Sequence, residues 1–311
     1  MSADQRPWLA QYPSGIPANV DTEVFTTLKD LLAEAMQKFA SKPAFVCMGK
    51  EMTYAELDKR STAFGAYLHY RGLQPGDRVA LMMPNLLQYP IALFGVLKAG
   101  MVIVNTNPLY TPREMKHQFN DADVSAVVIC ENFASSLEEI IGETNIKTVI
   151  TTSIGELLGA VKGRITNFVV RKVKKMVPKY NLPGAVTFKK ALTEGAGHKL
   201  PEFEGQRDDT IALQYTGGTT GVSKGAMLTN GNLVANALQS KAWMTQKLDE
   251  GGTKRMLCPL PMYHIFAFTV NAVAIFAHGV CNVLITNPRD LSTIVGAFKD
   301  NKIGGMTGVN T

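Results

Sequence analysis

The chain has 311 residues, 46% of them hydrophobic and 19% charged, which is typical of a folded globular protein and excludes a disordered one. Its net charge of +6 is uneven, because residues 160–199 hold ten Lys and Arg and one acid, a charge of +9, and the remainder carries −3. A positive charge confined to one segment argues against a general nucleic-acid binder, whose basic surface is usually broader.

In chain order, residues 1–24 are polar and proline-bearing and are expected to form an arm over the surface. Beyond them, helices and strands alternate. Capping boxes (T-x-x-E) at Thr53 and Thr111 predict two helix starts, because this pattern satisfies free N–H groups at a helix end. The expected helices are 27–39, 54–70, 86–98, one beginning at 111, 133–141, 229–247, 266–277 and 291–300. The expected strands are 44–47, 78–82, 101–104, 124–129, 148–150, 210–215, 255–258, 280–285 and 304–307.

This alternation predicts an α/β fold with mostly parallel sheets and helices on both faces. Strands of such sheets are buried on both sides and therefore continuously apolar, as V-S-A-V-V-I at 124–129 nearly is. We divide the chain into a first α/β subdomain, residues 1–200, and a second, residues 201–311, which holds the glycine-rich segment described below.

The four cysteines lie far apart, in or beside apolar segments, and form no C-x-x-C pair. We therefore expect buried free thiols in a reducing cytosol, and neither zinc ligands nor disulfides. The first residues show no basic region followed by an apolar core, so no secretory signal is predicted. Apolar runs at 79–104 and 265–285 are interrupted by polar residues and glycine, and buried helices and strands explain them better than membrane spans.

The stretch Tyr215–Gly225 reads Y-T-G-G-T-T-G-V-S-K-G and lies between the expected strand 210–215 and the expected helix 229–247. Its glycines let the backbone wrap closely around an anion, and its hydroxyls and lysine add donors. A strand, a donor-rich glycine loop and a helix together are a typical phosphate-binding arrangement. A flexible linker is the alternative, although linkers seldom sit directly between a buried strand and a helix. The candidate binding residues are Thr216, Gly217, Gly218, Thr219, Thr220, Gly221, Ser223, Lys224 and Gly225.

Three common motifs fit this loop poorly. A Walker loop needs Gly-Lys-Ser/Thr, whereas Lys224 stands between Ser223 and Gly225. The dinucleotide fingerprint needs glycines at i, i+2 and i+5, and the glycines of the loop do not have this spacing. Residues 221–225 match the G-x-S-x-G elbow of hydrolases, but the expected strand ends eight residues before Ser223, too far for that tight turn. A hydrolase is therefore the least favoured alternative.

The loop resembles the phosphate-binding signature of the adenylate-forming (AMP-binding) enzymes, whose usual pattern is Y-T-S-G-T-T-G-x-P-K-G. Gly218 replaces the usual Ser and Ser223 the usual Pro, which removes one hydroxyl donor and loosens a turn but keeps the backbone donors. The stretch 100–111 resembles a second, structural motif of this family. The segment Phe168–Phe188 is similar to the bacterial long-chain fatty-acid–CoA ligases in particular.

The resemblance implies a ligase that uses ATP, Mg²⁺ and CoA. Such an enzyme joins a fatty acid to AMP with release of pyrophosphate, and then transfers the acyl group to the thiol of CoA. The mixed anhydride supplies the good leaving group that a carboxylate lacks, and the protein positions the reactants and stabilises negative charge. In this scheme the loop binds the departing pyrophosphate, Lys224 and Thr216 act in catalysis, and Thr216 is also a magnesium ligand.

A second candidate site is the stretch Pro261–Phe268, P-M-Y-H-I-F-A-F, which follows an expected strand ending near Pro259. Its prolines stop the strand and leave His264 at a helix start, where the helix dipole favours a neutral imidazole. An isolated histidine is more often a satisfied core residue. Here the sequence resembles the P-x-x-H motif of the family. That motif implies that His264 orients the carboxylate and the acyl-adenylate, that Ile265 touches the nucleotide and that Phe268 gates a fatty-acid tunnel.

Residues 157–179 have a basic amphipathic pattern, in which apolar side chains recur at helical spacing and the Lys and Arg residues avoid that stripe. The favoured interpretation is a core-facing helix with a solvated basic back. The alternative is a helix that lies on an anionic membrane surface. It would suit an enzyme that takes fatty acids from a bilayer, and would place a cytoplasmic protein on the inner face of the cell membrane.

The chain ends at Thr311, a little over halfway along the usual length of the family, so the resemblance implies a truncated ligase that is inactive alone and lacks the small carboxy-terminal domain. Two alternatives stay open: an adenylating ligase for another carboxylic acid, and a nucleotide- or membrane-binding fragment without turnover. The expected partners are fatty acid, ATP and CoA, and no nucleic acid. Membrane contact through 157–179 and a homodimer are left open.

Overall fold

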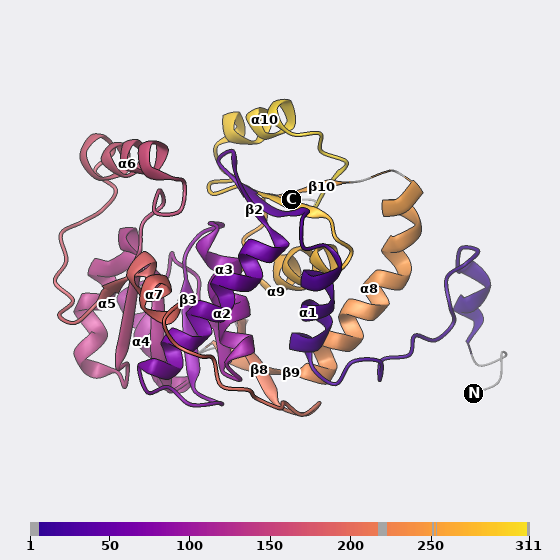
Figure 1. The fold of residues 1–311 in the computed structure, drawn as a ribbon, viewed down its shortest axis with the longest axis horizontal. Helices are drawn as coiled ribbons and strands as arrows, with labels where there is room; N and C mark the ends of the chain where they lie inside the picture. Colours follow the sequence, from indigo (N-terminus) through magenta and orange to yellow (C-terminus); the bar gives the residue numbers. More distant parts are fainter. Residues whose placement is uncertain (1–5, 217–222, 251, 253, 310–311) are drawn as a thin grey trace.

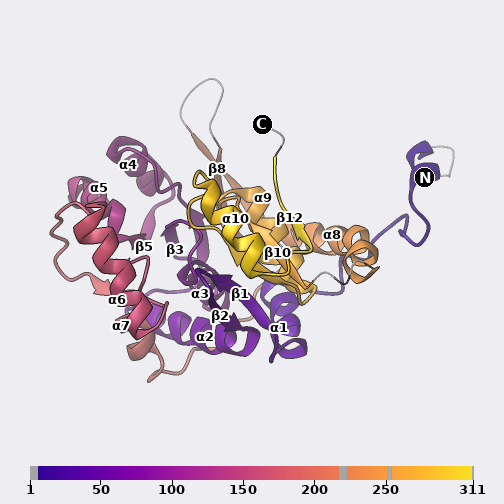
Figure 2. The same ribbon diagram turned by 90° about the horizontal axis from the view of Figure 1, so that it is seen from above.

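The computed structural model describes residues 6–216, 223–250, 252 and 254–309. Two sheets layered with helices form the body of the molecule, and the amino-terminal segment extends away from it (Figures 1 and 2). This segment contains a short 3₁₀ helix, Pro7–Gln11, that buries no residue. Its Tyr12 packs edge-on against Trp243 with ring centroids 4.9 Å apart, so the expected arm touches the body at this point.

The larger sheet has seven strands among the described residues, in the order β7-β6-β5-β3-β4-β8-β9. These strands are β3 (Arg78–Met82), β4 (Val102–Asn105), β5 (Val124–Cys130), β6 (Thr148–Thr152), β7 (Val186–Thr187), β8 (Thr210–Thr216) and β9 (Lys224–Thr229). Neighbouring strands are parallel except for β8 and β9. The central strands are almost wholly buried and apolar, because helices cover both faces.

The smaller sheet has five strands among the described residues, in the order β12-β10-β11-β1-β2. These strands are β1 (Pro43–Cys47), β2 (Lys50–Thr53), β10 (Arg255–Cys258), β11 (Cys281–Leu284) and β12 (Gly305–Met306). Only the β1–β2 pair is antiparallel among them. The two sheets confirm the expected α/β class with mostly parallel strands.

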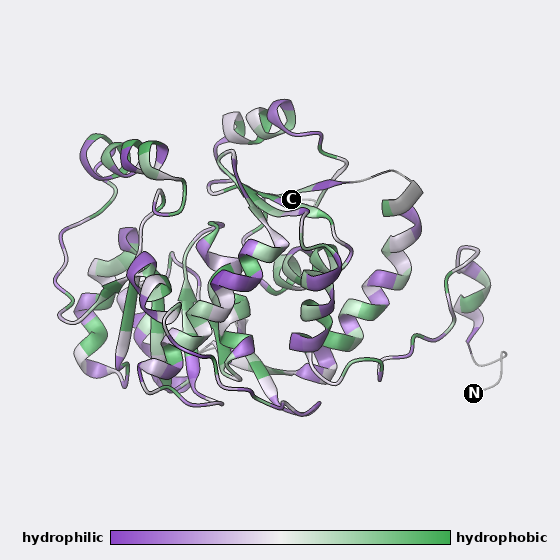
Figure 3. Ribbon diagram, viewed as in Figure 1, coloured by the Kyte–Doolittle hydropathy of each residue, from purple (hydrophilic) through white to green (hydrophobic). Residues whose placement is uncertain are grey.

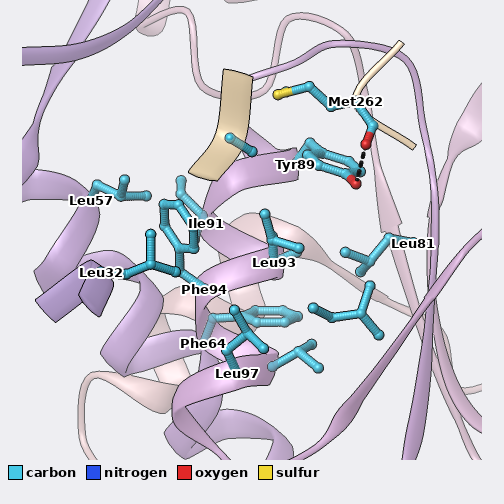
Figure 4. Close-up of a cluster of buried hydrophobic side chains, with 14 of the residues drawn as sticks. Leu32, Leu57, Phe64, Leu81, Tyr89, Ile91, Leu93, Phe94, Leu97 and Met262 are labelled. Atoms are coloured by element: carbon cyan, nitrogen blue, oxygen red, sulfur yellow. Dashed lines mark hydrogen bonds between the residues drawn. The ribbon is translucent and has the colours of Figure 1, made fainter. Parts of the chain in front are cut away.

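Helices separate and cover the sheets. The helices are α1 (Leu28–Lys38), α2 (Tyr54–Tyr70), α3 (Gln88–Lys98), α4 (Pro112–Asp121), α5 (Ala134–Ile140), α6 (Ala160–Phe168), α7 (Phe188–Gly195), α8 (Asn230–Glu250), α9 (Ile265–Ala267) and α10 (Leu291–Asp300). α4 and α5 pack on the outer face of the seven-stranded sheet, α2 and α3 fill the central core, and α10 packs on the outer face of the five-stranded sheet. Figure 4 shows part of the central core, to which α2 contributes Phe64, α3 contributes Phe94 and β3 contributes Leu81.

Most expected elements are present with ends shifted by a few residues. Both capping boxes form: the Thr53 side chain accepts from the N–H of Glu56, and Thr111 accepts from Glu114 in the same way. The expected helix 291–300 and strand 78–82 have the bounds that the sequence predicted. The sequence did not predict β2, β7, α7 or β9. The expected helix 266–277 continues from α9 as a π-helical stretch, Phe268–Ile275.

The expected passage from the glycine loop directly into a helix is wrong. The chain first returns along β8 as the antiparallel strand β9, and α8 begins only at Asn230. Without β9, strand β8 would leave one edge of the sheet with unpaired backbone N–H and C=O groups, and the hairpin satisfies them. The residues 217–222 between the two strands lie outside the described residues.

The favoured interpretation of the basic amphipathic segment is also wrong. Its helix comprises α6 and a π-helical turn, Val169–Val173, and therefore ends before Lys179. The apolar stripe does not face the core, because Val161, Ile165 and Phe168 are 73%, 58% and 61% exposed. Figure 3 shows hydrophobic and hydrophilic residues alternating along α6.

The two sheets do not separate at residue 200. β1 and β2, from the first 53 residues, join β10, β11 and β12, whereas β8 and β9 follow residue 200 and complete the larger sheet. The predicted subdomain boundary between residues 200 and 201 therefore does not coincide with the division between the sheets. Each part of the chain contributes strands to both sheets, and one core cluster contains residues of both sheets.

All four cysteines are free and buried, as expected. Burial raises the pKa of Cys47 to about 11 and that of Cys130 to about 12, so both remain protonated thiols at neutral pH. In the part of the chain that the structure describes, a helix with the length and apolarity needed to cross a bilayer is not found.

The close approach of α2 and α3 generates a stability prediction. A Cβ atom on Gly95 would lie 2.8 Å from both the Phe64 ring and the Ser61 carbonyl oxygen, whereas one on Gly296 of α10 would meet no atom within 4 Å. We expect Gly95→Ala to lower the free energy of unfolding by about 1–3 kcal/mol through overpacking. Gly296→Ala should raise it by about 0.5–1 kcal/mol, because alanine suits a helix better. Urea unfolding measures both, and a neutral Gly95→Ala would contradict this packing.

Candidate functional site

The candidate phosphate loop begins and ends at the tip of the β8–β9 hairpin. Thr216 pairs with Lys224 across the hairpin, and the Ser223 hydroxyl donates to the Thr216 carbonyl over 2.8 Å. Thr216 and Lys224 are both exposed. Gly225 lies against the ring of Tyr215, where a Cβ atom would come within 2.9 Å of a ring carbon. The remaining predicted loop residues, Gly217, Gly218, Thr219, Thr220 and Gly221, lie outside the described residues.

The stretch that carries His264 follows β10, and the buried side chain of Asn85 fixes its path. Asn85 Nδ2 donates to the carbonyls of Cys258 and Leu260 over 3.1 and 2.9 Å, and Asn85 Oδ1 accepts from the N–H of Met262 over 2.9 Å. Loss of this side chain would leave buried backbone groups unpaired, which costs more than the bonds themselves contribute. Asn85 therefore holds the backbone of residues 258–262 in one conformation.

A chain of buried side chains joins the same stretch to the seven-stranded sheet. The hydroxyl of Tyr89, on α3, lies 2.7 Å from the carbonyl oxygen of Met262 (Figure 4). The same hydroxyl lies 2.7 Å from Asn105 Oδ1. Asn105 Nδ2 donates to Gln214 Oε1 over 3.1 Å, and Gln214 Nε2 donates to the carbonyl of Tyr263 over 3.1 Å. We call Tyr89, Asn105 and Gln214 the clasp. Its two ends contact the carbonyl groups of two successive residues, Met262 and Tyr263.

The clasp sets the position of His264 relative to the phosphate loop. Gln214 stands two residues before Thr216 on β8, and Tyr263 directly precedes His264. Gln214 and Asn105 are register partners near the carboxyl ends of two parallel strands, the edge at which α/β sheets usually bind ligands. Burial raises the pKa of Tyr89 well above its ordinary value, so its hydroxyl stays a neutral donor.

His264 is exposed at the start of α9. Its backbone is extended, with φ −86° and ψ 140°, and its carbonyl accepts the N–H of Phe268 over 2.9 Å, which opens the helix. Its ring packs against that of Tyr263 with centroids 5.3 Å apart. Ile265 is exposed beside it, so both residues are accessible to a ligand. Phe268 is fully buried, and a gating role would require its ring to leave the core.

The expected magnesium ligand, Thr216, offers one exposed hydroxyl. Among the described residues no group of three or more His, Cys, Asp and Glu side chains is arranged to hold a metal ion. A single protein oxygen fits a Mg²⁺ ion that arrives with a nucleotide, because Mg²⁺ keeps several waters and is often bound through substrate phosphates.

Sequence reasoning missed Asn85 and the three members of the clasp. A signal was present, since each places a polar group within or beside an apolar run that was expected to be buried. Buried polar groups require partners, so such residues mark places where segments distant in sequence meet. Which segments meet was not visible from the sequence.

A cavity of about 860 Å³ lies along the seven-stranded sheet, close to the hairpin but apart from these residues. Its lining includes Leu97, Met101, Phe203, Tyr215 and Gly225, and does not include Thr216, Lys224 or His264. The cavity is therefore a second place where a ligand could bind. Of the predicted site residues that the structure describes, Gly225 alone lines it.

Known proteins resemble this chain in sequence family and in fold. The model of the family described as AMP-binding enzyme matches residues 32–311. A long-chain-fatty-acid–CoA ligase of Salmonella typhimurium is 48% identical over 305 residues, which are 98% of this chain and 54% of that protein. The chain thus spans about half the length of the curated relatives it matches.

Two solved structures share the fold. An anthranilate CoA ligase in complex with anthranoyl-AMP has a TM-score of 0.72 at 18% identity, covering 90% of this chain and 49% of that one. A long-chain-fatty-acid–CoA ligase from Archaeoglobus fulgidus has a TM-score of 0.70 at 20% identity, covering 94% and 53%. At these identities the likeness concerns the fold alone.

The clasp generates the second prediction. Tyr89→Phe removes the hydroxyl that lies between Asn105 and Met262 and should lower the free energy of unfolding by about 1–3 kcal/mol, because the buried oxygen that accepts its single proton loses that donor. Tyr70→Phe, at an exposed tyrosine, is the matched control and should be neutral within about 0.5 kcal/mol. Urea unfolding of both variants measures this, and equal stability of the two would refute the role of the clasp.

Proposed function

The chain belongs to the AMP-binding enzyme family, and on that premise we propose that it forms the large amino-terminal part of an ATP-dependent long-chain fatty-acid–CoA ligase. The substrate class is supported by the relative named as a long-chain-fatty-acid–CoA ligase. The observation that carries the proposal is the bond between Gln214 and the Tyr263 carbonyl, because it ties the base of the phosphate loop to the residue before His264.

The proposed reaction has two steps. The fatty-acid carboxylate attacks the α-phosphate of ATP, and the bond to pyrophosphate breaks, which gives acyl-AMP. The thiol of CoA then attacks the acyl carbon. The bond between the acyl group and AMP breaks, AMP leaves, and the acyl group is joined to CoA as a thioester. Neither step needs a covalent bond to the protein, so the protein contributes by positioning the reactants and by stabilising charge.

The described residues have distinct roles in this proposal. Lys224, exposed beside the loop, stabilises the negative charge that develops on pyrophosphate. His264 orients the carboxylate and then the acyl-adenylate, and Ile265 contacts the nucleotide. Mg²⁺ would be held by the Thr216 hydroxyl and the phosphates, and would neutralise part of their charge.

Fatty-acid-dependent exchange of pyrophosphate into ATP tests the proposal. The assay uses the protein together with any sequence that follows Thr311 in its gene, called here the gene-length protein. We expect exchange with palmitate and much less with benzoate or acetate; a preference for benzoate would identify a ligase for another acid. Lys224→Ala should lower the exchange rate about 100-fold to 1000-fold, since a charge-stabilising donor is lost. Lys299→Ala, at an exposed lysine of α10, is the control, and equal rates for the two variants would count against the site.

We further propose that α6 and the following turn lie on an anionic membrane surface. Polar and close backbone contacts fix this helix to the body: Arg171 pairs with the buried Glu131, and a Cβ on Gly163 would meet the Gly155 carbonyl at 2.3 Å. Because these contacts hold the helix, its exposed apolar stripe is left for another partner. An anionic bilayer fits the stripe and the exposed lysines beside it, Lys172, Lys174 and Lys175.

The same apolar surface continues into a groove of about 1030 Å³ between α6 and α10, and Ile165, Val169 and Met176 line one side of this groove. A fatty acid partitioned in the bilayer would meet this groove as the helix binds the membrane. The contact would supply the acid from the phase in which it is most concentrated, which supports a peripheral location on the inner face of the cell membrane.

Vesicle flotation tests the membrane proposal. We expect binding to phosphatidylglycerol vesicles that weakens with salt and that falls about 100-fold or more when Lys172, Lys174 and Lys175 are all changed to Glu, since each lysine contributes about 1 kcal/mol. Changing Lys189, Lys190 and Lys199 to Glu alters the net charge equally, away from the stripe, and is the control. If both triple variants float alike, or if the wild type does not float, the membrane role is wrong.

A further inference from the structure

His117 contacts the carboxyl-terminal end of the phosphate loop. It lies on α4, half-buried, with Nε2 3.0 Å from the carbonyl oxygen of Ser223. A carbonyl can only accept a hydrogen bond, so the His117 Nε2 carries the proton and donates. Ser223 directly precedes Lys224, and the bond therefore acts on the backbone beside the proposed catalytic lysine.

The Ser223 side chain is held as well. Its hydroxyl donates to the Thr216 carbonyl over 2.8 Å, which closes the base of the loop. Burial raises the pKa of Tyr110, and the neighbouring Ser223 side chain offsets part of this rise. Ser223 is thus fixed by its carbonyl and by its hydroxyl, from two separate segments of the chain.

One face of α4 holds both strands of the hairpin. His117 and Asp121 are four residues apart and so lie on the same helix face. Asp121 accepts a bond from the Tyr215 hydroxyl over 2.5 Å, one residue before Thr216 on β8. His117 reaches Ser223, the residue directly before the returning strand β9. α4 therefore contacts the hairpin on both sides of the Thr216–Lys224 pair, at Tyr215 on the sheet side and at Ser223 on the loop side.

The position of α4 is itself well determined. Its capping box at Thr111 fixes the first turn, and Met115 and Phe119 are buried in the outer core beside Val104 and Tyr215. A helix anchored in this way can hold a loop that follows it by more than a hundred residues in sequence. The contact is a property of the fold and leaves no pattern in the sequence.

We propose that His117 is a positioning residue for nucleotide binding, which holds Ser223 and hence Lys224 where the phosphates of ATP are bound. This inference rests on the proposed function. It adds a residue of α4 to Asn85, Tyr89 and Asn105, the other residues before position 200 that position the site.

The fold supplies a matched control. His69 on α2 makes the same kind of contact, with Nε2 3.2 Å from the carbonyl oxygen of Ala99 at the end of α3. It too joins two elements through an imidazole and a backbone carbonyl, but it lies away from the hairpin. A purely structural role predicts similar consequences for the loss of either ring.

The experiment measures KM for ATP, KM for palmitate and the melting temperature for His117→Ala, His117→Gln and His69→Ala in the gene-length protein. His117→Ala should raise KM for ATP about fivefold to tenfold, the worth of one hydrogen bond, with KM for palmitate changed by less than about twofold. His117→Gln places an amide N–H near the position of Nε2 and should recover most of the loss. His69→Ala should lower the melting temperature without changing KM for ATP.

Three results would overturn the inference: an unchanged KM for ATP in His117→Ala, an equal rise in His69→Ala, or no recovery in a folded His117→Gln. Calorimetric titration with ATP separates this outcome from failure of the proposed function. If the wild type binds ATP but shows no palmitate-dependent exchange, the ligase proposal fails, and the Kd values of the same variants decide whether His117 positions the nucleotide.

Discussion

The requirement that buried polar groups be paired fixes the relative position of the two sheets. Tyr89, Asn105 and Gln214 lie in the apolar interior, where an unpaired hydroxyl or amide would be costly, and they satisfy one another and the backbone of Met262 and Tyr263. A displacement of one sheet along the other would break several of these bonds together. This interior network therefore also positions two exposed residues, Thr216 at the end of β8 and His264 in the stretch that follows β10.

Around that network, packed strands and helices form a rigid support, and the residues proposed to act in the reaction are exposed on it. Parallel strands, the packed pair α2 and α3, and the anchored helix α4 hold short segments at their ends. The groups proposed to meet the reactants, Thr216, Lys224 and His264, are all exposed. Such an arrangement suits a reaction in which the protein forms no bond to the substrate and acts by placing charges and donors.

The local rules predicted the elements well, and the features they missed are non-local. The capping boxes at Thr53 and Thr111 and the apolar run of β5 are decided by neighbouring residues, and the structure has them. β9 reads K-G-A-M-L-T, which shows no alternation, and it is a strand because the edge of β8 needs a partner. The stripe on α6 has helical spacing, but spacing does not say whether a stripe faces the core or the outside. Likewise, β1 and β11 pair across more than two hundred residues, which no local pattern indicates.

The most direct test of the central claim is a crystal structure of the gene-length protein with palmitate and a non-hydrolysable analogue of ATP. The account predicts that the terminal phosphates lie within hydrogen-bond distance of Thr216 or Lys224, with the palmitate carboxylate beside the ring of His264. An analogue bound instead in the cavity lined by Leu97, Met101 and Phe203, with the hairpin tip and His264 free of contact, would contradict it.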